Sequence, residues 1–250
     1  MAKNYLPVGF WGEHGAWAMA LTSLGAGLAL GRPPSWQAWM LLPCVACLIG
    51  AKGLAQVARR TGRGWGALAG FALSGLAFAL PAAWAAPLPF ATVTTVAGPF
   101  AALYLYFADS PRWTRSLFVE GVGTLLMATA GPLALAASRP CTPEDLLGLG
   151  AALGTLFLPG VLRARMRKDP SPGIRALTAA SALMGLALWC ALVLRGLLAP
   201  WGLLGATVFL GDLWAVAALP QWRVRTIGVF FTFRYAAAAL ILALAWRQVG

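Results

Sequence analysis

The chain has 250 residues, of which 60% are hydrophobic and only 10% are charged, and its net charge is +12. These are too few polar residues to cover the surface of a water-soluble domain. In a soluble protein the positive charge would indicate nucleic acid. Here Lys and Arg stand at the ends of apolar runs, which argues against that partner and favours membrane orientation and contact with membrane lipids. No cleavable signal peptide is indicated, because Glu13 and His14 precede the first apolar run in place of basic residues.

Apolar stretches fill almost the whole sequence. A helix rises about 1.5 Å per residue, so about 20 apolar residues cross a hydrocarbon core of about 30 Å. Pro, Gly or charged residues separate the stretches and predict the helix ends. The predicted spans are 15–31, 36–58, 65–84, 88–107, 115–137, 145–162, 174–195, 200–219 and 227–246. We expect an all-α, polytopic membrane helical bundle of about nine transmembrane helices, forming a single domain over residues 1–250.

The distribution of basic residues predicts the orientation. Thirteen Lys and Arg residues fall on the side of the N-terminus, and four fall on the other side, at Arg32, Arg139, Arg195 and Arg247. Because basic loops stay in the cytoplasm, we expect a cell-membrane protein with its N-terminus in the cytoplasm and, after nine crossings, its C-terminus outside. Trp36, Trp84 and Trp246 are among the tryptophans expected near the outer boundary.

Small residues and prolines predict how the helices pack. Gly27 and Gly31, Gly66 and Gly70, and Gly150 and Gly154 are each four residues apart, which favours close helix packing within one bundle, with a face between two copies of the chain as the alternative. Pro43, Pro81, Pro99, Pro132 and Pro159 lie in or near spans and are expected to kink or end helices.

Four ionisable residues lie inside predicted spans: Lys52, Glu120, Asp212 and Arg234. We expect them in one layer roughly 8–13 Å from the cytoplasmic helix ends, facing the interior of the bundle, because a charge facing lipid is costly. Asp212 and Arg234 are the best pair, since each lies 11 residues from Arg223 at the centre of a short turn (223 − 212 = 11; 234 − 223 = 11). The layer is either an ion-pair network that locks the helices or the polar floor of a cavity open to the cytoplasm.

Other candidate residues stand at the cytoplasmic side. Glu13 and His14 form a carboxylate–imidazole neighbour pair able to act as acid and base, although a carboxylate at a helix start also compensates the helix dipole. The loops AKGLAQVARRTGR and RARMRKDPSPGIR are basic and suit phosphate or carboxylate headgroups, or only orientation and lipid contact. With one His and no paired acidic motif, we expect no metal site and no cofactor. Cys44 and Cys47 form a CxxC inside an apolar helix, where packing of small residues is the simpler interpretation.

Three stretches resemble a known family. EHGAWAM at residues 13–19, RARMR at 163–167 and GVFFTFR at 228–234 are similar to segments of the YwiC-like membrane proteins. More distantly, the nine-helix architecture and residues 103–123 resemble the UbiA superfamily of intramembrane prenyltransferases.

The UbiA resemblance implies Asp-rich motifs that hold Mg²⁺ against a prenyl diphosphate, yet AKGLAQVARR and RARMRKDP occupy those positions here. Metal-dependent prenyl transfer is therefore not expected. Direct binding of an anionic headgroup is the chemistry that the basic residues favour. The residues concerned are Lys52, Arg59, Arg60, Arg163 and Arg167.

Three functions follow as hypotheses. The leading one is binding of an amphipathic lipid or isoprenoid-like anionic ligand in a cavity that faces the cytoplasm, with Glu120, Asp212 and Arg234 completing the site. The second is a metal-independent lipid-modifying transferase that uses Glu13 and His14. The third is a small-solute or proton-coupled transporter through the charged layer. The sequence indicates no oligomeric state.

Overall fold

A computed structural model describes residues 14–107, 116–166, 169–218 and 224–246. Within these ranges the chain is helical and carries one isolated β-bridge, between Leu198 and Trp246. The helices, in chain order, are α2 (His14–Leu30), α3 (Trp36–Trp39), α4 (Leu41–Thr61), α5 (Trp65–Ala85), α6 (Pro87–Phe107), α7 (Leu117–Ala128), α8 (Ala130–Ser138), α9 (Pro143–Met166), α10 (Pro172–Leu194), the 3₁₀ turn η1 (Pro200–Gly202), α11 (Leu203–Ala218) and α12 (Val224–Ala245). Each of the nine predicted spans is occupied by helix, so the expected all-α bundle is confirmed.

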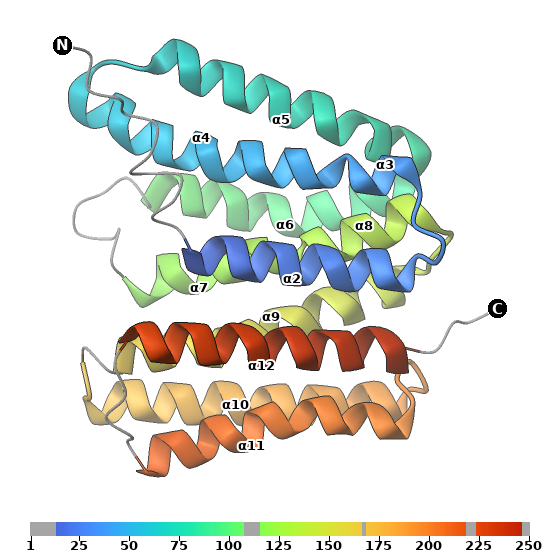
Figure 1. The fold of residues 1–250 in the computed structure, drawn as a ribbon, viewed down its shortest axis with the longest axis vertical. Coiled ribbons are helices and arrows are strands. Elements are labelled where there is room, and N and C mark those ends of the chain that lie inside the picture. The colour runs from blue at the N-terminus through green and yellow to red at the C-terminus, as the bar shows by residue number, and fades with distance from the viewer. Residues whose placement is uncertain (1–13, 108–115, 167–168, 219–223, 247–250) are drawn as a thin grey trace.

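The long helices run side by side and alternate in direction (Figure 1). Side-chain contacts define the two ends of the bundle. At the first end, Glu120 at the start of α7 pairs with Arg165 near the close of α9. At the second end, Gly31 after α2 faces Ser138 at the close of α8, and Trp246 after α12 binds Asp145 at the start of α9. The start of α2 and the close of α12 therefore lie at opposite ends, as an odd number of crossings requires.

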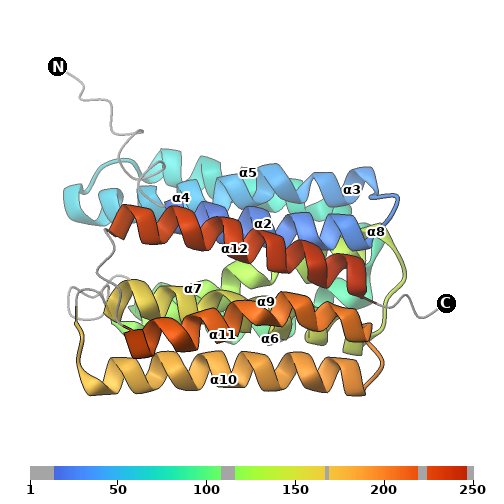
Figure 2. The ribbon, with the colours of Figure 1, turned by 60° about the horizontal axis from the view of Figure 1, so that its bottom comes forward.

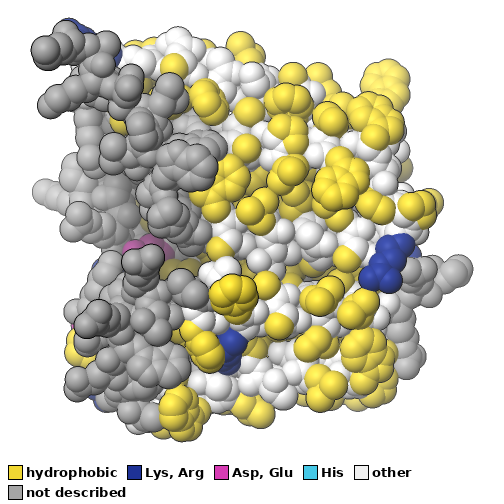
Figure 3. Space-filling view, viewed as in Figure 1, with side chains coloured by type: hydrophobic (Ala, Val, Ile, Leu, Met, Phe, Trp, Pro, Cys, Tyr) yellow, Lys and Arg dark blue, Asp and Glu magenta, His cyan; other side chains and the backbone are white. Residues whose placement is uncertain are grey.

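The helices have the length and composition of membrane spans. Six segments in the described residues are long and apolar enough to cross a bilayer, and two shorter apolar helices cover Ala16–Leu30 and Phe230–Ala245. Hydrophobic side chains lie over the middle of the bundle surface (Figure 3). Exposed Trp36, Trp84 and Trp201 stand towards the second end, where an amphipathic ring suits the membrane boundary.

Helix α9 is the centre of the bundle and α5 lies at its edge (Figures 1 and 2). In the span of α9, 61% of the apolar window is buried, against 11% in the span of α5. Leu149, Leu153 and Phe157 of α9 are buried against α10, α11 and α12, where Trp189 packs edge-on to Phe209. The ionisable residues inside the spans are therefore positioned mainly by α9 and its neighbours.

The predicted span 115–137 is not one straight helix, because it breaks between α7 and α8 at Thr129. Pro132 lacks the N–H group that would bond to the carbonyl of Ala128 four residues earlier. Ser23 of α2 supplies the replacement: its hydroxyl donates to the Ala128 carbonyl at 2.8 Å and accepts from the Gly131 N–H at 2.9 Å. A hydroxyl on another helix thus satisfies the backbone groups that the break releases, as the apolar interior requires.

Close approach of α2 to α8 depends on glycine. A Cβ at Gly27 would overlap the carbonyl oxygen of Gly131, so only a residue without a side chain fits there. Packing of Gly27 and Gly31 within the bundle is thus confirmed. The same expectation is wrong for Gly66 and Gly70 on α5, where a Cβ would meet no described heavy atom within 4 Å, because α5 turns that face outward.

Candidate functional site in the membrane-spanning helices

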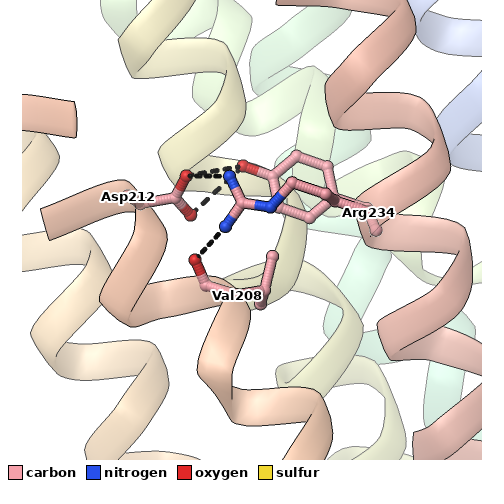
Figure 4. Close-up of polar contacts among 4 residues, drawn as sticks. Val208, Asp212 and Arg234 are labelled. Atoms are coloured by element: carbon pink, nitrogen blue, oxygen red, sulfur yellow. Dashed lines mark hydrogen bonds and ion pairs between the residues drawn. The ribbon is translucent and has the colours of Figure 1, made fainter. Parts of the chain in front are cut away.

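The centre of the candidate site is an ion pair between α11 and α12. Nη1 of Arg234 lies 3.5 Å from Oδ1 of Asp212, whose side chain is 0% exposed. Nη2 of the same guanidinium donates to the backbone carbonyl of Val208, one turn before Asp212 (Figure 4). The two helices form an antiparallel hairpin, which brings residues at equal distances from the turn to the same level. The predicted contact of Asp212 with Arg234 is confirmed.

Tyr235 adds a hydroxyl group to this pair. Its phenol donates towards the Asp212 carboxylate, with O–O distances of 3.3 Å to Oδ2 and 3.5 Å to Oδ1. The ring of Tyr235 stacks on Phe231 one turn earlier. A Cβ at Gly160 of α9 would come within 2.5 Å of the Tyr235 ring, so a glycine is needed where the two helices meet.

Arg163 of α9 lies against the same aromatic ring as Arg234. The Cζ atoms of Arg163 and Arg234 are 5.0 and 5.3 Å from the centroid of Phe231, within the range of a cation–π contact. Arg163 is 3% exposed, whereas ordinary arginines of a helix end lie in water. Asp212, Arg234, Tyr235, Arg163 and Phe231, which we call the charged cluster, therefore join three membrane-spanning helices.

Arg234 differs from the rest of the charged cluster because part of its side chain reaches the surface. The side chain is 20% exposed, and its Nε–H group has no hydrogen-bond partner among the described residues. A Cβ at Gly211 would come within 2.5 Å of Nη2, so the glycine provides the space that the guanidinium fills. Basic side-chain surface is visible between hydrophobic side chains in the lower half of the bundle, where α10, α11 and α12 lie (Figure 3).

Lys52 and Glu120 do not join this cluster in the way the sequence suggested. Nζ of Lys52 lies 5.6 Å from the centroid of the Tyr104 ring, on the α4 and α6 side of the bundle. Glu120 pairs with Arg165 at 3.5 Å, and both side chains are partly exposed. The four residues therefore do not form one network. Lys52, Glu120 and the Asp212–Arg234 pair make separate contacts on different helix pairs, and their common depth in the membrane stays a prediction.

The remaining predicted site residues fall outside the part of the chain that the structure describes. Glu13 and Arg167 lie outside the described residues, and so do the side chains of His14, Arg59 and Arg60. Their roles in binding or catalysis stay predictions.

A second polar cluster stands at the other end of the bundle. Oδ2 of Asp145 accepts hydrogen bonds from the backbone N–H and the hydroxyl of Thr142, while Oδ1 accepts from the indole Nε1–H of Trp246. Thr142 in turn accepts from the N–H of Asp145, which is the reciprocal pattern of a helix-capping box. The spacing T-x-x-D is visible in the sequence. Trp246 lies at the second end of the bundle, near the expected boundary, and is 4% exposed, so it locks α12 to α9.

Sequence reasoning missed Tyr235 and the depth at which Arg163 is buried. Tyr235 follows Arg234 directly and lies four residues after Phe231, so its position on the same helix face was a usable signal. Arg163 follows Gly160 by three residues, and a small residue one turn away allows a neighbouring helix to come close. In the described residues no group of three or more His, Cys, Asp and Glu side chains is arranged to hold a metal ion.

An apolar helical bundle of this length, with ionisable side chains inside its spans, defines an integral, multi-pass membrane protein. Residues 12–135 match the YwiC-like protein family. The N-terminal half of the chain is therefore identified with that family. Searches of curated proteins and of solved structures give no match. The more distant resemblance to the UbiA superfamily stays a prediction.

Proposed function

We propose that this protein binds an anionic, amphipathic ligand through the charged cluster, without Mg²⁺-dependent prenyl transfer. The observation that carries the proposal is the Arg234 guanidinium, which is partly exposed on a membrane-spanning helix and keeps a donor without a partner in the described part of the chain. An unused guanidinium donor at this depth is costly in lipid. An acidic headgroup would satisfy it with a charge-assisted hydrogen bond.

The neighbours of Arg234 support binding rather than mere neutralisation. Asp212 pairs with Nη1 of the guanidinium, and the Val208 carbonyl accepts a hydrogen bond from Nη2. These two contacts hold the guanidinium in a fixed orientation. A fixed fork with a free donor loses little side-chain entropy when a carboxylate or phosphate binds. Participation of Lys52, Arg59, Arg60, Glu120 and Arg167 in the same ligand site, and a cavity open to the cytoplasm, remain parts of the sequence-based hypothesis.

Lipid analysis of the purified protein tests the proposal. Wild-type protein is extracted in detergent, and its bound amphiphiles are compared by mass spectrometry with those of Arg234→Gln. A charge-assisted hydrogen bond contributes about 1.5–3 kcal/mol, so the variant should retain about 10- to 150-fold less of the enriched anionic species. Arg165→Gln is the matched control, because Arg165 is a partly exposed arginine paired with an acid outside the cluster. No enriched amphiphile in the wild type, or equal retention in all three proteins, would contradict the proposal.

Location and orientation of the protein are part of the proposed function. We expect it in the cell membrane with the first end of the bundle in the cytoplasm, because 13 of the basic residues lie on that side and four on the other. A phosphatase reporter fused after Gly250 should be active outside the cytoplasm, and a fluorescent reporter at the same place should be dark in an oxidising compartment. The reverse pair of signals would refute the orientation and leave the bundle itself unaffected.

One observation favours a second candidate, a proton-coupled transporter. Asp212 is fully buried and takes a hydrogen bond from the Tyr235 hydroxyl, an arrangement able to pass a proton inside the membrane. Proteoliposomes separate the two functions, because ligand binding alone moves no proton or solute across the bilayer. The transferase that would use Glu13 and His14 stays a prediction, and their substitution by Ala with unchanged cellular function would remove it.

A further inference from the structure

We infer that the ligand reaches Arg234 sideways from the lipid bilayer, between α11 and α12, and that it is a single-chain amphiphile with a monoanionic, carboxylate-type headgroup. This inference rests on the proposed function and adds the route and the chemical class of the ligand. It differs from entry through a cavity that opens to the cytoplasm.

The surface around Arg234 supports the lateral route. Phe230 and Phe233 of α12 are both exposed, and Phe233 is 72% exposed. The Cζ atom of Arg234 lies 5.4 Å from the centroid of Phe230, so the guanidinium borders this apolar surface directly. A hydrocarbon chain lying along these side chains would place its acidic end at Arg234.

The depth of Arg234 favours a single-chain ligand. Arg234 is ten residues after Val224, the first residue of α12 (234 − 224 = 10), in a helix of 22 residues. At about 1.5 Å per residue the guanidinium is about 15 Å along the helix and about 10 Å inside the predicted span 227–246, which is within the hydrocarbon core. The large headgroup of a two-chain phospholipid stays at the membrane surface and does not reach that level. A small carboxyl group on one flexible chain is much less costly to bring there.

The charges around Arg234 favour a monoanion. Asp212 already places one carboxylate 3.5 Å from Nη1, so a doubly charged phosphate on the same guanidinium would meet a like charge at short range. A single carboxylate can accept a hydrogen bond from the Nε–H group and meets less repulsion from Asp212 than a dianion would. The charge complementarity therefore selects a fatty-acid-like ligand over a phosphomonoester.

Photolabelling in lipid nanodiscs tests this inference. The probe is a long-chain fatty acid with a diazirine next to its carboxyl group, added to the bilayer, and the labelled peptides are identified by mass spectrometry. We expect labels on α11 and α12 near Arg234, with about tenfold less labelling in Arg234→Gln and wild-type labelling in Arg165→Gln. Arg234→Lys keeps the positive charge but lacks the planar guanidinium group, and it serves as the test variant if Arg234→Gln does not fold. Labelling of Arg234→Lys should also fall. Unlabelled fatty acid should compete better than a single-chain phosphomonoester of the same length.

The outcomes separate this inference from the proposed function. If the purified protein retains an Arg234-dependent amphiphile but the label falls on α4, α5 or α6, lateral binding is wrong and the proposed function stands. If the phosphomonoester competes better, the headgroup class is wrong. If Arg234→Lys and Arg234→Gln are labelled like the wild type, or if the α11 and α12 surface is found covered by another protein, the inference is overturned.

Discussion

Replacement of Ser23 by Ala removes the hydroxyl that repairs the break between α7 and α8. Ser23 is 0% exposed, and its hydroxyl bonds to the Ala128 carbonyl at 2.8 Å and to the Gly131 N–H at 2.9 Å. Each buried group left without a partner costs about 1–3 kcal/mol, which gives an upper range of about 2–6 kcal/mol for two groups. Hydrogen bonds between membrane helices average about 0.6 kcal/mol, which gives about 1.2 kcal/mol as the lower bound. We therefore expect a loss of about 1–6 kcal/mol in the free energy of unfolding.

The assay is equilibrium unfolding in mixed micelles with increasing sodium dodecyl sulfate, followed by circular dichroism. Ser181→Ala is the matched control, because the buried Ser181 hydroxyl bonds only to the Thr178 carbonyl of its own helix. It should change stability by less than about 0.5 kcal/mol. Pro132→Ala restores an N–H group for the Ala128 carbonyl, so Ser23→Ala should cost less in that background. Equal stability of Ser23→Ala and Ser181→Ala would refute the repair of the break by Ser23.

Three further results are expected. Gly27→Ala places a Cβ on the Gly131 carbonyl oxygen and should prevent folding, whereas the Cβ of Gly25→Ala meets no atom within 4 Å and should be tolerated. Fluorescence-detected size exclusion should show a normal peak for Gly25→Ala alone; similar peaks for both variants would contradict the close approach of α2 to α8. Asp212→Asn should lower the free energy of unfolding by about 3–5 kcal/mol, and full stability of this variant would contradict the ion pair. Exchanging Asp212 with Arg234 should recover much of the folding but not ligand retention. Burial and the Asp145 carboxylate raise the pKa of the Cys141 thiol to about 11, so little thiolate is present at neutral pH. In a variant with Cys141 as its sole cysteine, maleimide labelling should therefore rise about tenfold per pH unit from about pH 7 to 10, whereas a plateau by about pH 9 would show an ordinary thiol.

The helices, and the contact between Asp212 and Arg234 in the candidate site, could be predicted from the sequence. Long apolar runs bounded by Pro, Gly and charge specify where helices begin and end, and a short turn fixes which residues of a hairpin share a level. Asp212 and Arg234 are such a pair, and their contact follows from counting residues on both sides of Arg223.

The rest depends on how each helix is rotated about its axis, which no local pattern specifies. Glu120 pairs with Arg165 because α7 packs on α9, and these helices have no short hairpin that sets their register. The glycine pair of α5 has the same spacing as that of α2, yet only the pair in α2 faces a neighbour. The break at Thr129 could not be predicted from the local sequence, because the backbone groups that it releases are satisfied by Ser23, more than a hundred residues away in sequence.

An experimental structure of the protein purified with native lipids tests the central claim most directly. We expect elongated density between α11 and α12 that ends about 2.7–2.9 Å from the Arg234 guanidinium, the distance of a charge-assisted hydrogen bond. Well-resolved side chains around Arg234 with the guanidinium bound only to Asp212 and Val208, and protein atoms closing the space beside it, would contradict the claim.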